Sequence, residues 1–101
     1  MKVFLDDVRS PPDGSWVLVA TAKAAIDLLA SGAVTHMSLD NDLGEDEPEG
    51  YTVANWLERR VLTDPTFPIP VISVHSANPV ARQRMQAAIA NIERAREKRG
   101  G

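Results

Sequence analysis

Three short apolar runs in the chain each end in chemically reactive side chains. Asp6 and Asp7 follow the first run, Asp40 follows the second, and His75 follows the third. Carboxylates held close together repel one another, so such a cluster needs a cation or a proton to be stable. Hard oxygen ligands suit Mg²⁺ or Mn²⁺, and a cation of this kind would in turn bind phosphate. The predicted ligands of this divalent cation are Asp6, Asp7, Asp40 and Asp42.

For this expected phosphate chemistry, His75 supplies a group that can transfer protons. A histidine titrates near neutral pH, so it can act as general acid or base or hydrogen-bond a phosphate oxygen. The predicted catalytic residues are His75, Asp40 and Asp6, and the predicted substrate contacts are Arg9, Asn41, Ser76 and Asn78.

Each of these residues also has a structural explanation. Aspartates cap turns through bonds from side chain to backbone, and His75 could be fixed to a neighbouring loop. Asn78 precedes Pro79, a typical pair at the start of a helix. The acidic residues 45–49 do not have the spacing of an EF-hand calcium loop, and a solvated charge run explains them better.

The three reactive ends require elements that bring them together. Short apolar runs separated by helical patterns predict parallel strands, and open α/β sheets place ligand sites beyond the carboxyl ends of such strands. The loop at residues 9–14 is too short and too rich in proline to form a helix. We therefore expect a flavodoxin-like three-layer α/β sandwich that lacks its first helix, with a four-stranded, mainly parallel sheet in the order 2-1-3-4. The expected strands are residues 2–5, 16–19, 34–39 and 69–74, and the expected helices are 21–30, one across 53–61, and one beginning at 78–79.

Length and composition indicate one domain. The 101 residues predict a single domain at 1–98 and a disordered tail at 99–101. The chain has no cysteine, which excludes disulfides, a thiol nucleophile and thiolate metal sites. We expect no signal peptide and no membrane span, because no stretch approaches the roughly 20 apolar residues that a bilayer requires. A cytoplasmic protein is the expectation.

Charge is distributed unevenly along the chain. Residues 1–78 hold 12 acidic and 5 basic side chains, whereas residues 79–101 hold 2 acidic and 6 basic ones. A solvated terminal helix with a basic last turn would explain this pattern, because cations at a helix C-terminus favour the helix dipole. The alternative is a patch, including Arg94, Arg96, Lys98 and Arg99, that attracts a polyanionic substrate.

Three strings, Val3–Arg9, Ser38–Gly44 and Val74–Pro79, together resemble the cyclic-phosphate processing receiver domain family. The resemblance covers about residues 1–95 and implies a shortened receiver-like fold that acts on cyclic phosphates of nucleotides or nucleic-acid ends. An ordinary receiver also has a lysine after a late strand, and this chain has no counterpart, so the comparison disfavours phosphorelay signalling. Asn41 stands where the family motif commonly has histidine, and an amide does not titrate. This departure argues against a mechanism with two histidines.

Three functions remain open at this stage. The first is a phosphodiesterase-like hydrolase that opens a cyclic phosphate of a nucleotide, a cyclic oligonucleotide or an RNA end, assisted by a magnesium or manganese ion. The second is a non-catalytic receiver-like module that binds a cyclic nucleotide or a partner protein. The third is phosphate acceptance at Asp40. We expect no membrane partner and no DNA sequence recognition, and a homodimer remains open.

Overall fold

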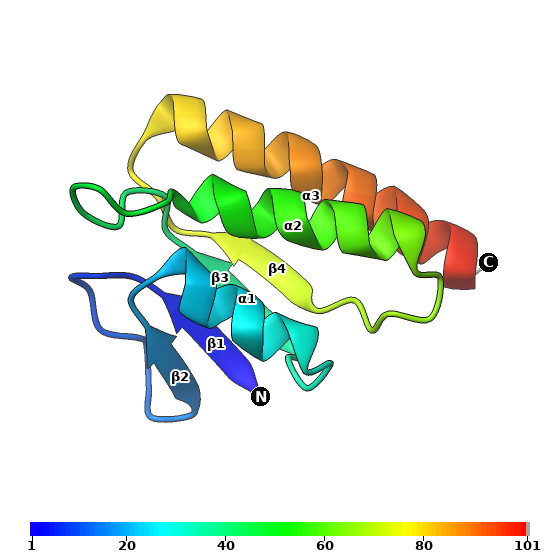
Figure 1. Ribbon diagram of the computed structural model, residues 1–101, viewed down its shortest axis with the longest axis horizontal. Coiled ribbons are helices and arrows are strands. Elements are labelled where there is room, and N and C mark those ends of the chain that lie inside the picture. The colour runs from blue at the N-terminus through cyan, green and yellow to red at the C-terminus, as the bar shows by residue number, and fades with distance from the viewer. Residues whose placement is uncertain (101) are drawn as a thin grey trace.

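The computed structural model describes residues 1–100 and shows four strands and three helices (Figure 1). In chain order they are β1 Lys2–Leu5, β2 Trp16–Val19, α1 Ala22–Ala30, β3 His36–Leu39, α2 Gly50–Thr63, β4 Val71–Val74 and α3 Pro79–Gly100. The predicted bounds of β1 and β2 are correct, whereas β3 and β4 begin two residues later than predicted. In β4 the reason is Pro70, which has no N–H to donate to a neighbouring strand.

The four strands form one fully parallel sheet in the order β2-β1-β3-β4, as predicted. The missing first helix is confirmed as well, because β1 passes to β2 through a loop. The register pairs Phe4 with Leu18 and Ser38, and Ser38 with Ser73. Successive side chains of a strand point to opposite faces. The paired residues therefore share one face of the sheet, together with the residue two positions before each of them on its strand.

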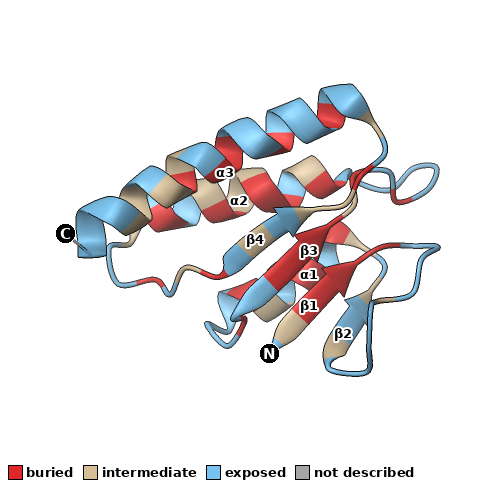
Figure 2. Ribbon diagram, turned by 180° about the vertical axis from the view of Figure 1, so that it is seen from behind, coloured by how far each residue is buried: buried red, intermediate tan, exposed pale blue. Residues whose placement is uncertain are grey.

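The hydrophobic core lies between the opposite face of the sheet and the helices. Val3, Leu5, Met37 and Leu39 are buried there against apolar residues of all three helices. Thr21 begins α1 by accepting a hydrogen bond from the backbone N–H of Ala24, which satisfies an otherwise unpaired donor. The buried strand residues and the inward stripes of the helices are coloured red in Figure 2.

The expected third layer of the sandwich is absent from the described residues. Helices α1 and α2 both lie over one face of the sheet (Figure 1), α3 packs beside α2 along β4, and the other face is uncovered (Figure 2). The missing first helix explains this correction, because no other described element crosses that face. We call it the open face; its residues are Lys2, Phe4, Trp16, Leu18, His36, Ser38, Val71 and Ser73. β4 is therefore not covered on both sides as predicted, and Val71 is 55% exposed.

The C-terminal helix also differs from expectation. Residues 99 and 100, predicted as part of a disordered tail, continue α3, and residue 101 lies outside the described residues. The guanidinium of Arg99 explains the order, because it donates to the backbone carbonyls of Val61, Asp64 and Phe67 at 2.5–2.8 Å. None of the helices within residues 1–100 is long and apolar enough to cross a membrane.

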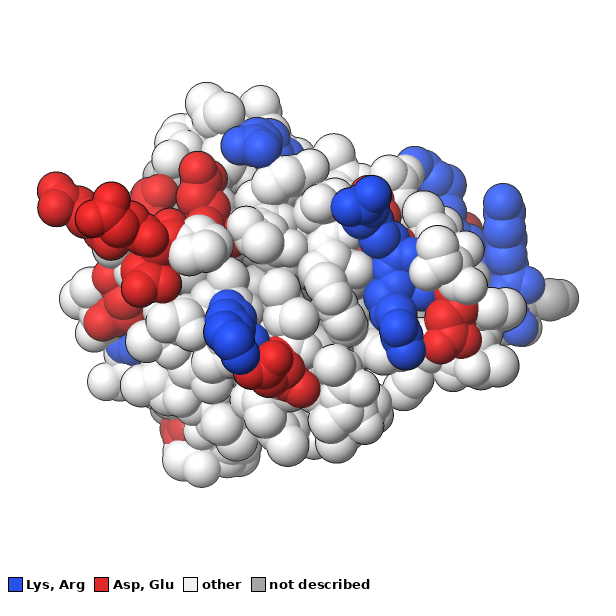
Figure 3. All heavy atoms as spheres, viewed as in Figure 1, with Lys and Arg blue, Asp and Glu red and all other residues white. Residues whose placement is uncertain are grey.

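The basic residues of the last turns of α3 lie at the opposite end of the molecule from the acidic loop. Figure 3 shows acidic side chains gathered at one end of the molecule and most of the visible basic ones at the other. Arg96 donates to the carbonyls of Ile69 and Pro70, so it fixes the segment before β4 in the same way that Arg99 fixes the end of α2. These contacts favour a structural role for the basic last turns over the predicted polyanion patch.

Candidate active site

The carboxyl edge of the sheet brings Asp6, Asp40 and His75 together. The backbone N–H groups of these residues donate to Val19, Leu5 and Leu39 respectively, so the parallel ladder continues one residue beyond each strand. Each of the three side chains offers a ligand atom, and these atoms all lie within 4.8 Å of one another. The three predicted catalytic residues therefore form one cluster, drawn from three adjacent strands.

His75 is held by contacts on both ring nitrogens and on one ring face. Its Nε2 lies 3.0 Å from Oδ2 of Asp6, and its Nδ1 lies 2.7 Å from Oγ of Ser38. The ring stacks on Phe4 with centroids 4.4 Å apart and planes 8° from parallel. Because a carboxylate only accepts, Nε2 carries a proton, and the Ser38 hydroxyl donates to Nδ1 when the ring is neutral or accepts from it when the ring is charged.

Ser38 is a site residue that the sequence analysis did not identify. It is buried, and it precedes Asp40 by two residues on the same strand, so both side chains lie on the same face of the sheet. The spacing of two residues from Asp40 is the feature of the sequence that could have identified Ser38 as a site residue. Ser38, His75 and Asp6 form a hydrogen-bonded chain, but the serine lies beneath the imidazole on the sheet and has no open approach for a substrate. It orients His75 and is not placed as a nucleophile.

Asp6 is a buried carboxylate with its oxygens already paired. It is only 2% exposed, and its Oδ1 accepts the backbone N–H groups of Val8 and Arg9, each at 2.8 Å. Burial alone would raise the pKa of Asp6, but these two hydrogen bonds, together with the hydrogen bond and charge of His75, outweigh burial and lower the pKa. Asp6 therefore remains ionised at neutral pH.

Asp40 is shifted in the opposite direction. Burial raises the pKa of this carboxyl, and the neighbouring charge of Asp6 adds to the increase. A hydrogen bond of 2.8 Å from the backbone N–H of Asn41 and the charges of His75 and Arg9 oppose the shift without cancelling it. Two adjacent carboxyl groups whose pKa values are moved apart are the usual basis for separate roles, one as a fixed anion and one as a proton carrier.

Arg9 joins the loop after β1 to the end of β4. Its Nη1 donates to the backbone carbonyl of His75 at 2.7 Å, and the residue as a whole is exposed. This contact fixes the guanidinium at the rim of the cluster, where it can accept an anionic substrate.

The two carboxylates of the cluster line a shallow depression of about 400 Å³, and its lining residues are Asp6, Asp7, Val8, Arg9, Asp40, Asp42, Gly44 and Ala77. The predicted metal ligands Asp7 and Asp42 lie in its wall and are exposed, and they do not belong to the tight three-residue cluster. His75 is the third member of that cluster. The groups closest together are therefore two carboxylates and an imidazole, whereas the sequence predicted four carboxylates.

The other three predicted substrate contacts have partners within the protein. The amide of Asn41, 1% exposed, donates to Glu49 and Asp42 and accepts the backbone N–H of Tyr51. Ser76 Oγ accepts the backbone N–H of Asn78 at 3.2 Å, and Asn78 caps α3 by accepting that of Ala81. These side chains shape the loops around the cluster, and of the predicted substrate contacts only Arg9 leaves an exposed charged group beside it.

The geometry agrees with a comparison against known families. The cyclic-phosphate processing receiver domain matches residues 1–91, which include all three strand ends and most of α3. The chain belongs to this family. The resemblance inferred from the three strings is confirmed, and the family name places this receiver domain in cyclic-phosphate processing. No curated protein and no solved structure matches the chain.

One glycine of this receiver domain is required by the packing of the site. A Cβ at Gly50 would lie 1.7 Å from the backbone oxygen of Asp40. Gly50 also donates its N–H to the carbonyl of Asn41 at 2.9 Å, so α2 begins directly against the strand end that carries Asp40. Any larger residue would displace one of the two elements.

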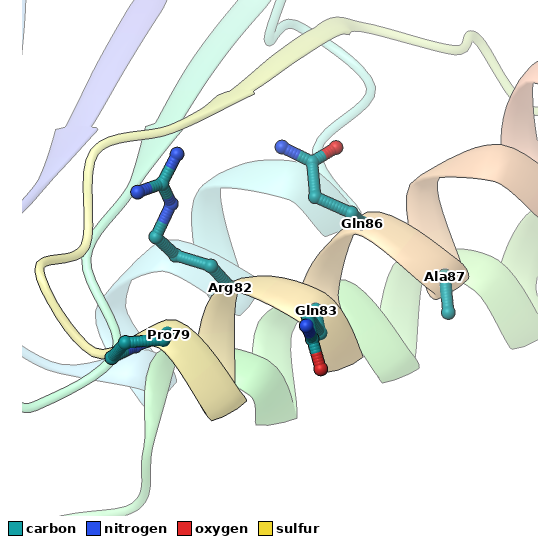
Figure 4. Close-up of a pocket in the computed structure, with 5 residues that line it drawn as sticks. All are labelled: Pro79, Arg82, Gln83, Gln86 and Ala87. Atoms are coloured by element: carbon teal, nitrogen blue, oxygen red, sulfur yellow. The ribbon is translucent and has the colours of Figure 1, made fainter.

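A larger hollow lies elsewhere, on α3. It has a volume of about 570 Å³ and is lined by Pro79, Arg82, Gln83, Gln86 and Ala87 (Figure 4). It contains no carboxylate and no histidine, so it offers no general acid or base. In Figure 4 the side chains of Arg82 and Gln86 point from α3 toward β4. The carboxyl groups that could transfer protons line the smaller depression at the sheet edge instead.

Proposed function

We propose that this receiver domain is a hydrolase that opens a cyclic phosphate at the carboxyl edge of its sheet. The observation that carries the proposal is the convergence of Asp6, Asp40 and His75 within 4.8 Å, with two carboxyl groups whose pKa values are shifted in opposite directions. The family membership supports cyclic phosphate as the substrate class.

The proposed reaction assigns one role to each member of the cluster. Ionised Asp40 takes a proton from water as the water oxygen bonds to phosphorus. The bond between phosphorus and one ring oxygen breaks, and the Nε2 proton of the His75 imidazolium leaves its hydrogen bond with Asp6, 3.0 Å away, and passes to that leaving oxygen. Asp6 stays ionised throughout. Arg9 faces the phosphate oxygens from the rim, and a later proton transfer from Asp40 to His75 restores the starting state.

A divalent cation fits the same donor set. Asp40 and Asp6 are hard oxygen ligands and His75 is an imidazole, a combination that suits Mn²⁺ better than Mg²⁺. A bound cation would neutralise phosphate charge and lower the pKa of a bound water molecule. Asp7 and Asp42 are the outer carboxylates of the depression and would add to its attraction for cations. A cation bound to His75 Nε2 would prevent that atom from transferring a proton. If hydrolysis requires a metal ion at this atom, His75 is a metal ligand; if it does not, His75 is free to act as the proton donor.

The test is hydrolysis of a panel of cyclic phosphates by wild-type protein, with EDTA or with Mn²⁺, followed by chromatography. A matched control exists because the chain has two histidines, and His36 is exposed outside the cluster. We expect His75→Gln to lose about 10²–10⁴-fold in rate and His36→Gln to retain the wild-type rate. Absence of turnover in both EDTA and Mn²⁺ for every cyclic mononucleotide, cyclic oligonucleotide and RNA 2′,3′-cyclic end would overturn the proposal.

A binding module is the second candidate, because both ring nitrogens of His75 already have protein partners. In that case the same cluster would capture a cyclic nucleotide without reacting. The two functions are distinguished by recovery of the bound nucleotide: an intact ring after prolonged incubation favours the module, and a ring-opened monophosphate favours the hydrolase.

A further inference from the structure

The open face and the candidate active site form one continuous surface. Along β1, β3 and β4, residues two apart share a face, so Asp6 follows Phe4, Asp40 follows Ser38, and His75 follows Ser73 on the same side. The ring of His75 confirms this direction, because it contacts both Phe4 and Ser38 of the open face. A ligand held at the sheet edge therefore has the open face directly beneath it.

Aromatic and apolar side chains lead away from the cluster across this face. His75 stacks on Phe4, and Trp16 meets the same phenyl ring edge-on with centroids 6.1 Å apart. The His75 side chain is 19% exposed, so part of the ring that stacks on Phe4 is accessible to a ligand. Leu18, beside Phe4 in the register, is 51% exposed. Unpaired bases stack on flat surfaces of this kind in sheet-based nucleic-acid binding proteins.

The size of the open face helps to identify what it binds. Four strands about 4.8 Å apart, each of four residues that rise about 3.3 Å, give roughly 250 Å². A stable protein interface buries about 800 Å² of accessible surface on each partner, so the open face alone would form only part of such an interface. A ligand smaller than a protein partner fits this area better.

Basic side chains that could hold the phosphate of a ligand stand at the border of the open face. Arg9 stands at the carboxyl edge, Lys2 lies 5.0 Å above the Trp16 ring, and Arg82 points toward β4 from α3 (Figure 4). Within residues 1–100, neither Lys2 nor Arg82 forms an ion pair. The carboxyl edge also carries the carboxylates of the depression, so Arg9 is the basic group that would face a phosphate there.

We propose that the part of the open face next to the cluster, at Phe4 and Leu18, binds the base of a nucleoside cyclic phosphate, with the base stacked on the exposed part of the His75 ring while its phosphate lies at Asp40 and Arg9. His36, at the opposite end of β3, lies outside this part. This inference rests on the proposed function for the position of the phosphate. It narrows the substrate class to cyclic phosphates that carry a nucleobase next to the reacting ring.

The binding test uses Trp16 as a reporter. The chain has two tryptophans, so Trp56→Phe leaves Trp16 as the single one, and Trp56 packs away from this face against Phe67. We expect adenosine 3′-monophosphate, which is not consumed, to change Trp16 emission saturably. Glycerol phosphate, which has no base, should not do so at the same concentrations.

Two exposed leucines provide a matched pair of variants. In the Trp56→Phe protein, Leu18→Ser should weaken adenosine 3′-monophosphate binding about tenfold, the order expected for loss of a base-stacking surface. Leu62→Ser, at a 62% exposed position on α2, should leave the affinity unchanged. Both positions are exposed, so neither change is expected to unfold the protein.

The outcomes separate this inference from the proposed function. Equal affinity in the two serine variants, or equal binding of glycerol phosphate and the nucleotide, would overturn base binding even if cyclic phosphates are hydrolysed. Emission that changes with protein concentration alone, together with a dimer in sedimentation that Leu18→Ser abolishes, would overturn it in favour of a second copy of the chain. Base-dependent binding without hydrolysis would support the inference and contradict the hydrolase.

Discussion

The Nε2 atom of His75 lies 3.0 Å from the carboxylate of Asp6, although 69 residues separate them in the chain. Parallel pairing of β1, β3 and β4 places the two strand ends side by side, and the backbone N–H groups of Val8 and Arg9 fix the other oxygen of Asp6. The orientation of the imidazole therefore depends on a carboxylate that is itself held rigidly. Interactions of this kind keep a general acid in one position before the substrate arrives.

Asp6→Asn should reduce the rate of cyclic-phosphate hydrolysis by about 10²–10⁴-fold, because an amide cannot stabilise the imidazolium of His75. The protein should remain folded, since the amide oxygen can still accept from the backbone of Val8 and Arg9. Steady-state kinetics on the wild type and the variant measures this loss. An unchanged rate would show that His75 does not need Asp6.

The same variant should change how stability depends on pH. The pKa of Asp6 is lower in the folded state than its ordinary value of 3.8, so ionised Asp6 stabilises the fold above that pH. This contribution should be complete at neutral pH and should be lost as pH falls below 3.8 toward the folded pKa. Urea unfolding from pH 7 to 2 should therefore show a difference between wild type and Asp6→Asn that narrows with acidification. A difference that widens would contradict the sign of the shift.

Asp40→Asn should have the opposite effect on stability. Because the pKa of Asp40 is raised in the folded state, its ionised form opposes folding above the ordinary value of 3.8. The variant should therefore unfold at a higher temperature than wild type at pH 7, and this gain should disappear as the pH falls below 3.8. Hydrolysis should nevertheless be lost, because the amide cannot take a proton from water. A variant that is less stable at pH 7 would argue that Asp40 is stabilised by its neighbours.

Gly50→Ala tests the contact between α2 and the site. The added Cβ would overlap the backbone oxygen of Asp40, and we expect a loss of about 1–3 kcal/mol in the free energy of unfolding, as for overpacked interiors. Gly14→Ala is the matched control, because a Cβ there meets nothing within 4 Å. Chemical denaturation of both variants gives the comparison. Equal stability would mean that α2 shifts without cost.

Arg99→Gln tests the structural role of the last turn of α3. The substitution removes the guanidinium that donates to three backbone carbonyls, and we expect a loss of about 1–3 kcal/mol of stability. Lys98→Gln removes the same charge next to it and should change stability little. Neither variant should alter nucleotide affinity or its salt dependence. A marked loss of nucleotide affinity in Lys98→Gln would instead support the prediction that these basic residues attract a polyanionic substrate.

Much of the fold follows from local sequence. Pro11 and Pro12 in the loop before β2 indicated the missing first helix, and the apolar runs indicated the strands and their three reactive ends. The strand order came from the resemblance of the element order to a flavodoxin-like sheet, and it is confirmed. The uncovered sheet face was not predicted, because apolar residues such as Leu18 and Val71 are compatible with either a buried or an exposed strand. Whether a face is covered depends on where helices pack, and that is a long-range property.

The sequence predicted which residues form the central cluster of the site, but it did not predict which side chains they contact. Asp6, Asp40 and His75 follow directly from strand ends, whereas the stacking of His75 on Phe4 depends on a side-chain direction that sequence does not reveal. Asn41 was expected to meet substrate, yet its amide joins the acidic loop to α2. A buried amide with several partners cannot be distinguished from an exposed one by residue type alone.

The most direct test of the account is ³¹P NMR of uridine 2′,3′-cyclic phosphate incubated with wild type, Asp40→Asn and His36→Gln, once in Mn²⁺-free buffer and once with Mn²⁺, which is removed by chelation after the reaction and before the spectrum is recorded. The account predicts that the cyclic-phosphate signal is replaced by that of a monophosphate with wild type and His36→Gln, and that it persists with Asp40→Asn. A cyclic signal that persists with wild type under both conditions, or a monophosphate formed equally by Asp40→Asn, would contradict it.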